Sequence, residues 1–143
     1  MDNHNNQQAE IAGLGRITTN QLLNLNKVQN GAILITDKAS AYKFYDRFPV
    51  TPGHTLIIPK RHVSNYFDLC QEEPGNINEL QFICRDVLHK KYKPQGFNLG
   101  VNVGEAAGQT IFHCHIHLIP RYTGDVANPR GGVRGVIPER QNY

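Results

Sequence analysis

The sequence predicts an α+β fold in which about five antiparallel strands form a sheet and one main helix packs on a face of it. Two observations lead to this prediction. Several short runs rich in β-branched and aromatic residues are bounded by turn-forming residues, and one long run repeats its apolar residues at helical spacing. The chain has 143 residues and a mass of 16.1 kDa. A single domain is therefore expected.

The N-terminal part supplies a tail, a short helix and the first strands. Residues 1–20, which begin MDNHNNQQAE, are expected to form a disordered polar tail. The apolar cluster within residues 22–28 is interpreted as a short helix. The turn-forming residues that separate the following runs predict three consecutive antiparallel strands, at residues 32–37, 42–48 and 54–60.

The long helical run covers residues 76–92, and residues 64–69 before it are expected to form a helical turn. Asn76 is expected to be the N-cap of the helix, with Glu79 three residues later as in a capping box. Pro94 follows and ends the helix. One face of the helix is apolar and is expected to cover the sheet; it carries Leu80, Ile83, Cys84, Val87 and Leu88.

The last two strands follow the helix. Residues 97–104 and 113–120 alternate with a period of two, which is typical of strands. The sequence after them, residues 126–143, is rich in glycine, proline and arginine and has no periodicity. We therefore expect a core domain at residues 21–125, with residues 126–143 as an irregular tail of the same domain.

Composition excludes several classes of function. The net charge of +3 is too small to indicate a nucleic-acid-binding protein. Apolar runs stay far below the roughly 18 residues that a membrane span needs, and the N-terminus has no signal-peptide pattern, so a soluble protein without membrane partners is expected. The three cysteines are odd in number and lack CxxC spacing. A reducing, cytoplasmic location fits this usage.

Three histidines stand at alternate positions in the stretch GQTIFHCHIHLIPRY: His113, His115 and His117. On a strand, side chains two residues apart share a face and lie about 7 Å apart, so the three rings are expected to converge on one bound group. Three interpretations are open at this point. The rings form a solvated polar stripe, they bind a metal ion, or they catalyse a nucleophilic substitution at phosphorus.

The chemistry of imidazole distinguishes the last two interpretations. Three neutral imidazoles can hold a catalytic zinc ion, but each ligating ring then requires a hydrogen-bonded partner such as a carboxylate. Glu105, the nearest acidic residue, precedes a turn. A neutral imidazole can also attack a phosphate ester and form a covalent intermediate, provided that neighbouring groups hold its tautomer and donate to the phosphate oxygens. Gln109 and Thr110 are available as such donors.

The sequence resembles the histidine triad (HIT) family, whose signature alternates three histidines with apolar residues, as HCHIHLI does here. Three further segments, VTPGHTLIIPKRH, FNLGVNVG and AAGQT, are similar to their counterparts in that family in order and spacing. The resemblance covers roughly residues 41–125. The tail GDVANPRGGVRGVIP resembles that of microbial members related to the fragile histidine triad branch, which contains dinucleoside polyphosphate hydrolases.

The resemblance implies a catalytic role for four histidines. His115 would be the nucleophile that attacks the α-phosphorus of a nucleotide and carries a nucleotidyl intermediate. His117 would contact the α-phosphate and the bridging or leaving atom. His113 would orient its neighbours, and His54 would lie beside the nucleophile.

The resemblance also implies a set of nucleotide-binding residues. Asn102 would reach the phosphate or ribose, and Gln109 and Thr110 would donate to the phosphate. Asp46 would accept the ribose hydroxyls, as a carboxylate is suited to do, with Phe44 near the base. Each of these residues also has an ordinary structural interpretation, as a turn, cap, core or surface residue, and both interpretations stay open.

No metal is expected. Some family members bind structural zinc through N-terminal cysteines together with histidines that match His62 and His113. This chain has no cysteine before Cys70. His62 is therefore interpreted as an ordinary surface or packing residue. No tightly bound cofactor is expected, although a nucleotide substrate can enter as a divalent-metal complex.

The histidine in the last triad position, His117, implies a hydrolase, because the family's nucleotidyltransferases and phosphorylases have glutamine there. A dinucleoside polyphosphate is favoured as substrate because Arg130 and Arg134 could hold extra phosphates. A purine nucleoside phosphoramidate hydrolase, and a nucleotide-binding module with weak activity, are the alternatives. The resemblance also implies a homodimer.

Overall fold

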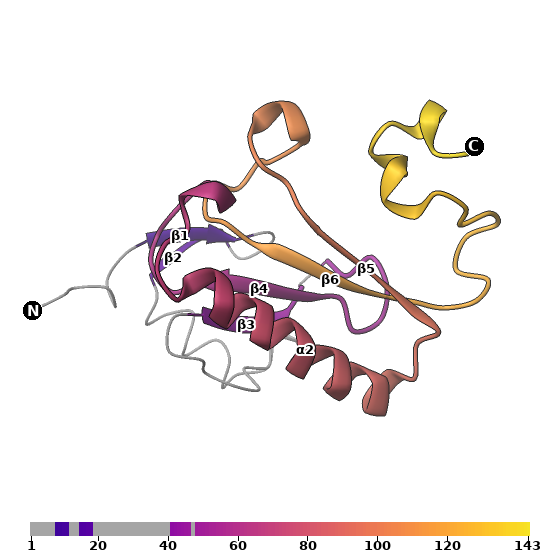
Figure 1. Ribbon diagram of the computed structural model, residues 1–143, viewed down its shortest axis with the longest axis horizontal. Coiled ribbons are helices and arrows are strands. Elements are labelled where there is room, and N and C mark those ends of the chain that lie inside the picture. Colours follow the sequence, from indigo (N-terminus) through magenta and orange to yellow (C-terminus); the bar gives the residue numbers. More distant parts are fainter. Residues whose placement is uncertain (1–7, 12–14, 19–40, 47) are drawn as a thin grey trace, which may run out of the picture.

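A computed structural model describes residues 8–11, 15–18, 41–46 and 48–143. The chain has an α+β fold in which four antiparallel strands in the order β3-β4-β6-β5 form a sheet and one long helix crosses a face of it (Figure 1). The strands and the helix are β3 (Ala41–Tyr45), β4 (Thr55–Pro59), β5 (Gly96–Val101), β6 (Ile116–Arg121) and α2 (Glu73–Tyr92).

Four of the predicted strands are present, and the remaining one, at residues 32–37, lies outside the described residues, as does the helix predicted at residues 22–28. A second, two-stranded sheet lies near the N-terminus, where β1 (Gln8–Ile11) pairs antiparallel with β2 (Gly15–Thr18). Residues 8–11 and 15–18 thus form paired strands where a disordered tail is expected from the sequence.

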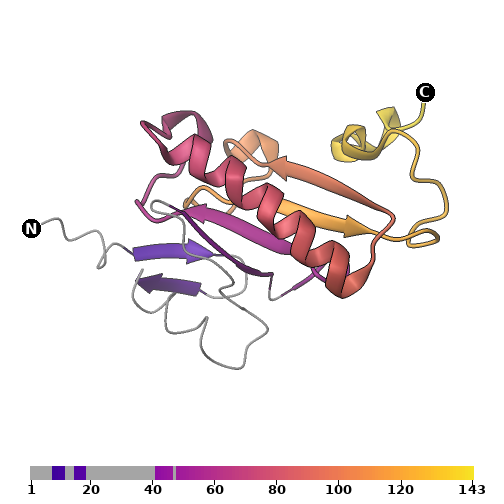
Figure 2. The same cartoon turned by 60° about the horizontal axis from the view of Figure 1, so that its bottom comes forward.

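The register of the sheet separates two faces of β6. Leu118 pairs with Thr55 of β4 and Leu99 of β5, and with Ile116 it is buried against the helix. His117 lies between them in sequence and therefore faces the opposite side of the sheet, where it pairs with Leu56 and Gly100. The helix thus covers the face of the sheet opposite to the one that carries His117 (Figure 2).

Helix α2 packs on the sheet through residues three or four positions apart, which share a face of a helix. Leu80, Cys84 and Leu88 are buried, as predicted, whereas Ile83 and Val87 are only partly buried because they flank this stripe. Burying a leucine or isoleucine side chain contributes about 1.5–3 kcal/mol. The core that supports the face carrying His117 is therefore built from this stripe and the buried residues of the strands.

The N-cap predicted at Asn76 is wrong, because the helix begins one turn earlier, at Glu73. The backbone N–H of Asn76 donates to the carbonyl of Glu72, so Asn76 already lies inside the helix. The Glu73 carboxylate accepts hydrogen bonds from the backbone of Cys70 and the guanidinium of Arg61. Since these contacts come from outside the helix, the local capping pattern could not reveal them.

Short 3-10 helices complete the fold. The helical turn predicted near residue 66 is present as η2 (Tyr66–Asp68), and η3 (Glu105–Ala107) lies between β5 and β6. The tail predicted to be irregular contains η4 (Gly132–Val136) and η5 (Pro138–Arg140), and η4 contacts β5. No helix in the described part of the chain has the length and apolar character to cross a membrane.

Candidate active site

The histidine triad does not lie on one strand face as predicted. Strand β6 begins at Ile116, so only His117 belongs to it, and His113 and His115 lie in the segment before it. The backbone N–H of Cys114 donates to the carbonyl of Val63 over 2.7 Å. This bond to the segment after β4 holds residues 113–115 away from the sheet ladder, so the three rings point to different neighbours.

His115 is held in one tautomer. Its Nδ1 lies 2.8 Å from the carbonyl oxygen of His113, which can only accept a hydrogen bond. Nδ1 therefore carries the proton, and Nε2 of the neutral ring has a free lone pair. The ring is 7% exposed, and its centroid lies 5.1 Å from that of His117. His115 thus has the tautomer and the neighbour that a nucleophilic imidazole requires.

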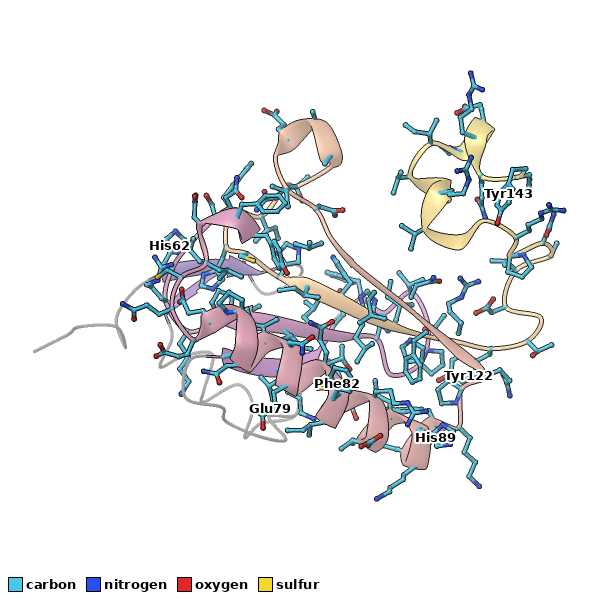
Figure 3. The ribbon with its side chains drawn as sticks, in the orientation of Figure 1. His62, Glu79, Phe82, His89, Tyr122 and Tyr143 are labelled. Atoms are coloured by element: carbon cyan, nitrogen blue, oxygen red, sulfur yellow. The ribbon has the colours of Figure 1, made fainter. Side chains whose placement is uncertain are left out.

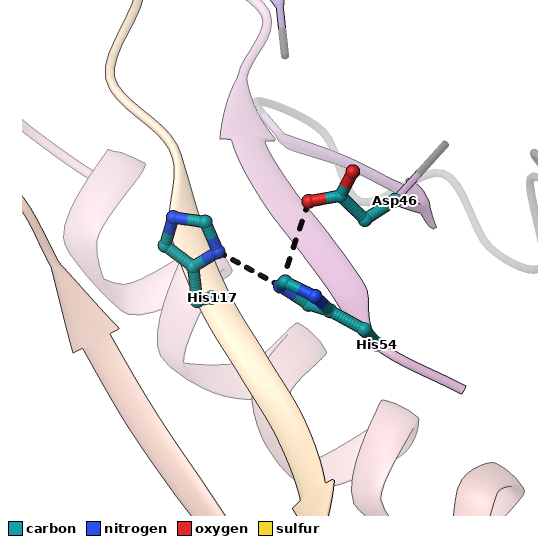
Figure 4. Close-up of side chains that lie close together, drawn as sticks. All are labelled: Asp46, His54 and His117. Atoms are coloured by element: carbon teal, nitrogen blue, oxygen red, sulfur yellow. Dashed lines mark hydrogen bonds and ion pairs between the residues drawn. The ribbon is translucent and has the colours of Figure 1, made fainter. Parts of the chain in front are cut away.

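His54 lies between Asp46 and His117 (Figure 4). Its Nε2 is 2.8 Å from Nδ1 of His117 and 3.6 Å from Oδ2 of Asp46. A turn brings it there: Gly53 has a φ of +89°, a conformation that favours glycine, and Leu88 and Tyr92 approach within 3.0 Å of where a Cβ would stand. The end of β3, the turn before β4, and β6 therefore meet at this cluster.

The backbone of Val50 determines how protons are arranged in the cluster. Its N–H donates to Nδ1 of His54 over 3.1 Å. The neutral His54 ring therefore has its proton on Nε2, which donates to Nδ1 of His117. His117 in turn carries its own proton on Nε2. The chain of hydrogen bonds thus makes His117 a donor at the nitrogen that does not face His54.

The histidines of the cluster are neutral at neutral pH. Burial, followed by the nearby His115 and His54, lowers the pKa of His117 to about 4. Burial also lowers the pKa of His54, and His115 lowers it further, against the opposing effect of Asp46. The tautomers described above require neutral rings, so the lowered pKa values of His54 and His117 are consistent with the hydrogen bonds of these two residues.

His113 lies apart from this cluster. It is 2% exposed, its Nε2 donates to the carbonyl of Pro59 over 2.8 Å, and its Nδ1 is 3.1 Å from Nδ1 of His62. Burial is the main cause that lowers the pKa of His113 to about 4. Both nitrogens of His113 are thus occupied by protein groups, so it can orient the segment that carries His115 but has no nitrogen left for a substrate.

The predicted nucleotide-binding residues are divided between this face and other places. Asp46 belongs to the cluster, and its Oδ1 also accepts from the backbone of Phe48. Asn102 is partly buried directly after β5, whose last residue pairs with Ile116 at the start of β6. Thr110 is exposed. The side chain of Phe44 lies outside the described part of the structure.

Gln109 points into the protein. Its side chain is buried and bridges three backbone groups: Oε1 accepts from Gly104, and Nε2 donates to the carbonyls of Ser64 and Ile111. Every polar atom of the amide thus has a protein partner. Gln109 joins the loop between β5 and β6 to the segment after β4, which makes it a brace for the residues that lead to His115.

The two arginines predicted to hold phosphates lie in the tail. Arg130 and Arg134 each have their guanidinium carbon 4.9 Å from the centre of the Tyr143 ring, and Arg134 also donates to the carbonyl of Arg140. Tyr143 and His62, which contacts His113, lie at opposite ends of the molecule in Figure 3. Arg130 and Arg134 thus lie against the C-terminal aromatic ring.

Oxygen and nitrogen atoms of Asp46, His54 and His117 lie within 4.8 Å of one another, a spacing at which a metal ion could be held. The protonation of His54 argues against it, because a metal ligand needs a free lone pair. Since the Val50 N–H occupies Nδ1, the proton of the neutral ring is on Nε2, the atom that faces the other two groups. Of the three side chains, His54 and His117 share a hydrogen bond, and the Asp46 carboxylate lies 3.6 Å from the same nitrogen of His54.

Comparison with known proteins identifies the family of this chain. The model of the HIT domain matches residues 26–124. The chain belongs to the HIT family. A HIT-like protein of Mycoplasma pneumoniae is 39% identical over 88 residues, which cover 62% of this chain and 61% of that protein. An asymmetrical bis(5'-nucleosyl)-tetraphosphatase of Schizosaccharomyces pombe is 35% identical over 82 residues, 57% of this chain and 45% of the enzyme.

The fold of the chain also matches that of a solved structure. The diadenosine triphosphate hydrolase of Plasmodium falciparum, in a complex with cyclomarin A, superposes with a TM-score of 0.65 and 25% identity over 85% of this chain and 75% of that one. The HIT domain here thus spans only part of the length of these relatives.

Two contacts around the histidines were not predicted from the sequence. His62, interpreted as a surface or packing residue, is hydrogen-bonded to the ring of His113. The second contact is that of the backbone N–H of Val50, which fixes the tautomer of His54. His62 follows the end of β4 and belongs to no periodic pattern, and a sequence does not show which backbone N–H groups donate to side chains. Both contacts could therefore be identified only from the folded structure.

Proposed function

We propose that this protein hydrolyses dinucleoside polyphosphates at the α-phosphate through a covalent nucleotidyl intermediate on His115. One observation carries the proposal: the hydrogen bond from His115 Nδ1 to the His113 carbonyl fixes the proton on Nδ1 and leaves Nε2 of the buried ring as the atom that can attack. The membership of the HIT family and the activities of its S. pombe and P. falciparum relatives support a nucleotide substrate.

In the first step, Nε2 of His115 uses its lone pair to attack the α-phosphorus. The bond from phosphorus to the bridging oxygen breaks, and its electron pair leaves with the remaining nucleoside oligophosphate. The proton on Nδ1 stays hydrogen-bonded to the His113 carbonyl, which stabilises the imidazolium character of the intermediate. The Nε2–H of His117 donates to a phosphate oxygen or to the bridging oxygen.

In the second step, water attacks the phosphorus of the intermediate. The electron pair of the P–N bond returns to Nε2 of His115, a proton passes to solvent, and a nucleoside monophosphate is released. Transfer to phosphate instead of water would describe a phosphorylase. The histidine at the last triad position, His117, supports hydrolysis, because glutamine stands there in the family's transferases.

Asp46 is the residue proposed to hold the ribose hydroxyls, since its carboxylate lies beside His54 and accepts hydrogen bonds. Asn102 and Thr110 are proposed to donate to the phosphate or ribose, and Phe44 to contact the base. Arg130 and Arg134, whose guanidinium groups both lie over the ring of Tyr143, are proposed to hold the additional phosphates of the substrate.

The proposed function is tested by incubating the protein with diadenosine tetraphosphate and with adenosine 5'-phosphoramidate, and by separating the products by chromatography. Release of adenosine monophosphate from the tetraphosphate supports the proposal. Stoichiometric binding of nucleotide without product would instead indicate a binding module. Cleavage that releases no nucleoside monophosphate from the tetraphosphate would contradict attack at the α-phosphate.

A homodimer is also proposed. Among the strands that the structure describes, β5 stands at the edge of the sheet, and edge strands commonly pair with another chain. Leu99 of this strand is 46% exposed, and Phe82 on the adjacent side of α2 is 67% exposed. The two side chains line one hollow together with Phe97, and this hollow offers an apolar surface to a second copy of the chain.

A reducing, cytoplasmic location is proposed as well. The free thiols of Cys70, Cys84 and Cys114 support it.

A further inference from the structure

We propose that a hollow beside the histidines binds the base of the leaving nucleoside, so that the protein favours dinucleoside polyphosphates over substrates without a second base. This tail hollow has a volume of about 540 Å³ and lies between the sheet, the turn before β4 and the tail. The inference rests on the proposed hydrolysis at the α-phosphate and goes beyond it, because it assigns a second binding site. The residues that form its walls include Val50, Asn98, Ile119, Arg121, Val126 and Gln141.

The tail hollow opens on the face of the sheet that carries His117. Ile119 follows His117 by two positions on β6, so the two side chains point to the same face and lie about 7 Å apart along the strand. Asn98 of β5 pairs with Ile119 and therefore lies on this face as well. Another wall is formed by Val50, whose backbone N–H donates to His54. The hollow thus adjoins the histidine cluster.

The sheet order places the tail hollow on the side of the leaving group. The ribose of the attacked nucleotide is proposed to bind Asp46, directly after β3. In the order β3-β4-β6-β5, His117 lies between β3 and the hollow, because Asn98 in the wall of the hollow belongs to β5. A phosphate chain that begins at His115 and passes His117 therefore runs toward the tail hollow.

The charged residues in the wall neutralise each other, so the hollow suits an uncharged ring system. Arg121 donates through Nε and Nη2 to the two carboxylate oxygens of Asp125, over 2.7 and 2.8 Å, and through Nη1 to Oδ1 of Asn98 over 2.6 Å. Each nitrogen of the guanidinium thus has a partner in the protein. A phosphate group would have to compete with Asp125 for this guanidinium, whereas a nucleobase would not.

Apolar side chains in the wall suit the faces of a planar ring. Val50 is 70% exposed and Val126 is 47% exposed, and Ile119 is only partly buried. A ring that fills the hollow would remove this apolar surface from water, which is favourable. Apolar walls with a few polar groups, around a volume of about 300–1,000 Å³, are typical of sites for small molecules.

Two amide groups suit the edge of a base. The bond from Arg121 to Oδ1 of Asn98 fixes the orientation of that amide, so that its Nδ2 donor remains for a ligand. Gln141 supplies a second amide from the tail, which turns back toward β5 after the end of β6 (Figure 1). Bases are recognised by hydrogen bonds at their edges and by contacts with their faces, and the tail hollow offers both.

The first test compares diadenosine tetraphosphate with adenosine 5'-tetraphosphate esterified to ribose at its terminal phosphate. The two substrates carry the same phosphate chain and net charge, and the ribose ester lacks the second base. Release of adenosine monophosphate is measured, and kcat/KM for the dinucleotide is halved because it has two equivalent ends. This value should exceed that for the ribose ester by at least about tenfold. Equal values would overturn the inference, and no cleavage of either substrate would instead contradict the proposed function.

The second test fills the tail hollow. In Val126→Trp the indole would occupy the space proposed for the base, so the ratio of the two kcat/KM values should fall to about one. Val133→Trp is the matched control, because Val133 is 59% exposed on η4 and does not line the hollow. This control should keep the wild-type ratio. A wild-type ratio in Val126→Trp would contradict the subsite, whether or not both rates fall.

A third test removes one donor without removing volume. Asn98→Asp keeps an oxygen that accepts from Arg121 and replaces the Nδ2 donor by a second oxygen. The added negative charge acts on the phosphates of both substrates, so the ratio of kcat/KM values isolates the loss of the donor. This ratio should fall by about threefold or more. An unchanged ratio would exclude Asn98 from base recognition.

Occupancy of the hollow is measured independently of activity, with an analogue of diadenosine tetraphosphate in which methylene groups replace the bridging oxygens next to both α-phosphorus atoms. Nuclear Overhauser effects should connect the methyl groups of Ile119 and Val126 with the protons of one adenine. Their absence while the analogue is bound would overturn the inference. Contacts of these methyl groups with a second copy of the chain, in a mixture of labelled and unlabelled protein, would also overturn it. Failure of the analogue to bind would contradict the nucleotide substrate itself.

Discussion

At the scale of single residues, carbonyl oxygens and backbone N–H groups set the chemistry of the histidines. The His113 carbonyl holds the Nδ1–H of His115, so Nε2 is the atom of this ring that can attack, and His54 is a donor to His117 because the Val50 N–H occupies its other nitrogen. Neither arrangement uses a charged partner. The acidic residue in the cluster, Asp46, lies 3.6 Å from His54 and remains available to a ribose.

Removal of the nucleophile should abolish turnover. His115→Gly deletes the attacking atom while leaving the backbone carbonyl and the rest of the cluster, so kcat should fall by more than about 100-fold, or about 2.7 kcal/mol in the barrier. Circular dichroism and nucleotide binding should remain close to those of the wild type. A variant that keeps more than about one hundredth of the wild-type rate would exclude His115 as nucleophile.

Stability should depend on pH through the buried histidines. The pKa values of His113 and His117 are lowered from 6.5 to about 4 in the folded protein, mainly by burial. Between these values the unfolded chain binds protons that the folded protein does not. The free energy of unfolding should therefore fall as the pH falls from about 6.5 to about 4. Urea titrations across this range measure the slope, which should be shallower in His113→Asn.

At the scale of elements, the turn before β4 and the segment before β6 create the site. The turn brings His54 to His117, and it depends on Gly53, whose φ is +89° and whose Cα faces the helix residues Leu88 and Tyr92. The segment before β6 is fixed by the bond from Cys114 to Val63 and by the Gln109 side chain. Helix α2 supports both from the other face of the sheet.

Gly53→Ala should damage the site through the backbone. A non-glycine residue at this φ costs about 1–3 kcal/mol, and its Cβ would also approach Leu88 and Tyr92 at 3.0 Å. We expect a loss of stability within or above this range and a loss of activity from displacement of His54. Gly108→Ala is the control, because Gly108 has a similar φ of +91° and nothing within 4 Å of its Cβ position. Denaturant unfolding of both variants should show the larger loss for Gly53.

These elements also explain what the sequence could predict. Residue composition and flanking turns identified the strand at residues 54–60, and alternation identified the one at residues 97–104; both regions contain strands of the sheet, β4 and β5. Alternation failed for residues 113–115, where the Cys114 amide bonds a distant segment after β4. The partner of His54 was likewise hidden, since it depends on contact between a turn and a strand 63 residues apart.

At the scale of the whole molecule, the sheet leaves β5 at one edge with an apolar surface beside it. If a second copy covers this surface, Phe82→Lys should weaken the dimer, because an ammonium group would be buried in the interface. Phe67→Lys is the control, since Phe67 is 79% exposed on η2. Sedimentation velocity should detect a shift toward monomer for Phe82→Lys alone. A monomeric wild-type protein at micromolar concentration would contradict the proposed dimer.

The covalent intermediate on His115 is the central claim, and it is tested most directly by trapping the intermediate. The protein is mixed with diadenosine tetraphosphate, quenched in alkali within the first turnover, because acid cleaves the P–N bond, and digested for mass spectrometry. The account predicts an adenylyl group on the peptide that contains residues 113–117, attached to His115, which disappears as adenosine monophosphate forms. Complete turnover without adenylylated protein at any time, or attachment of the adenylyl group to His113 or His117, would contradict it.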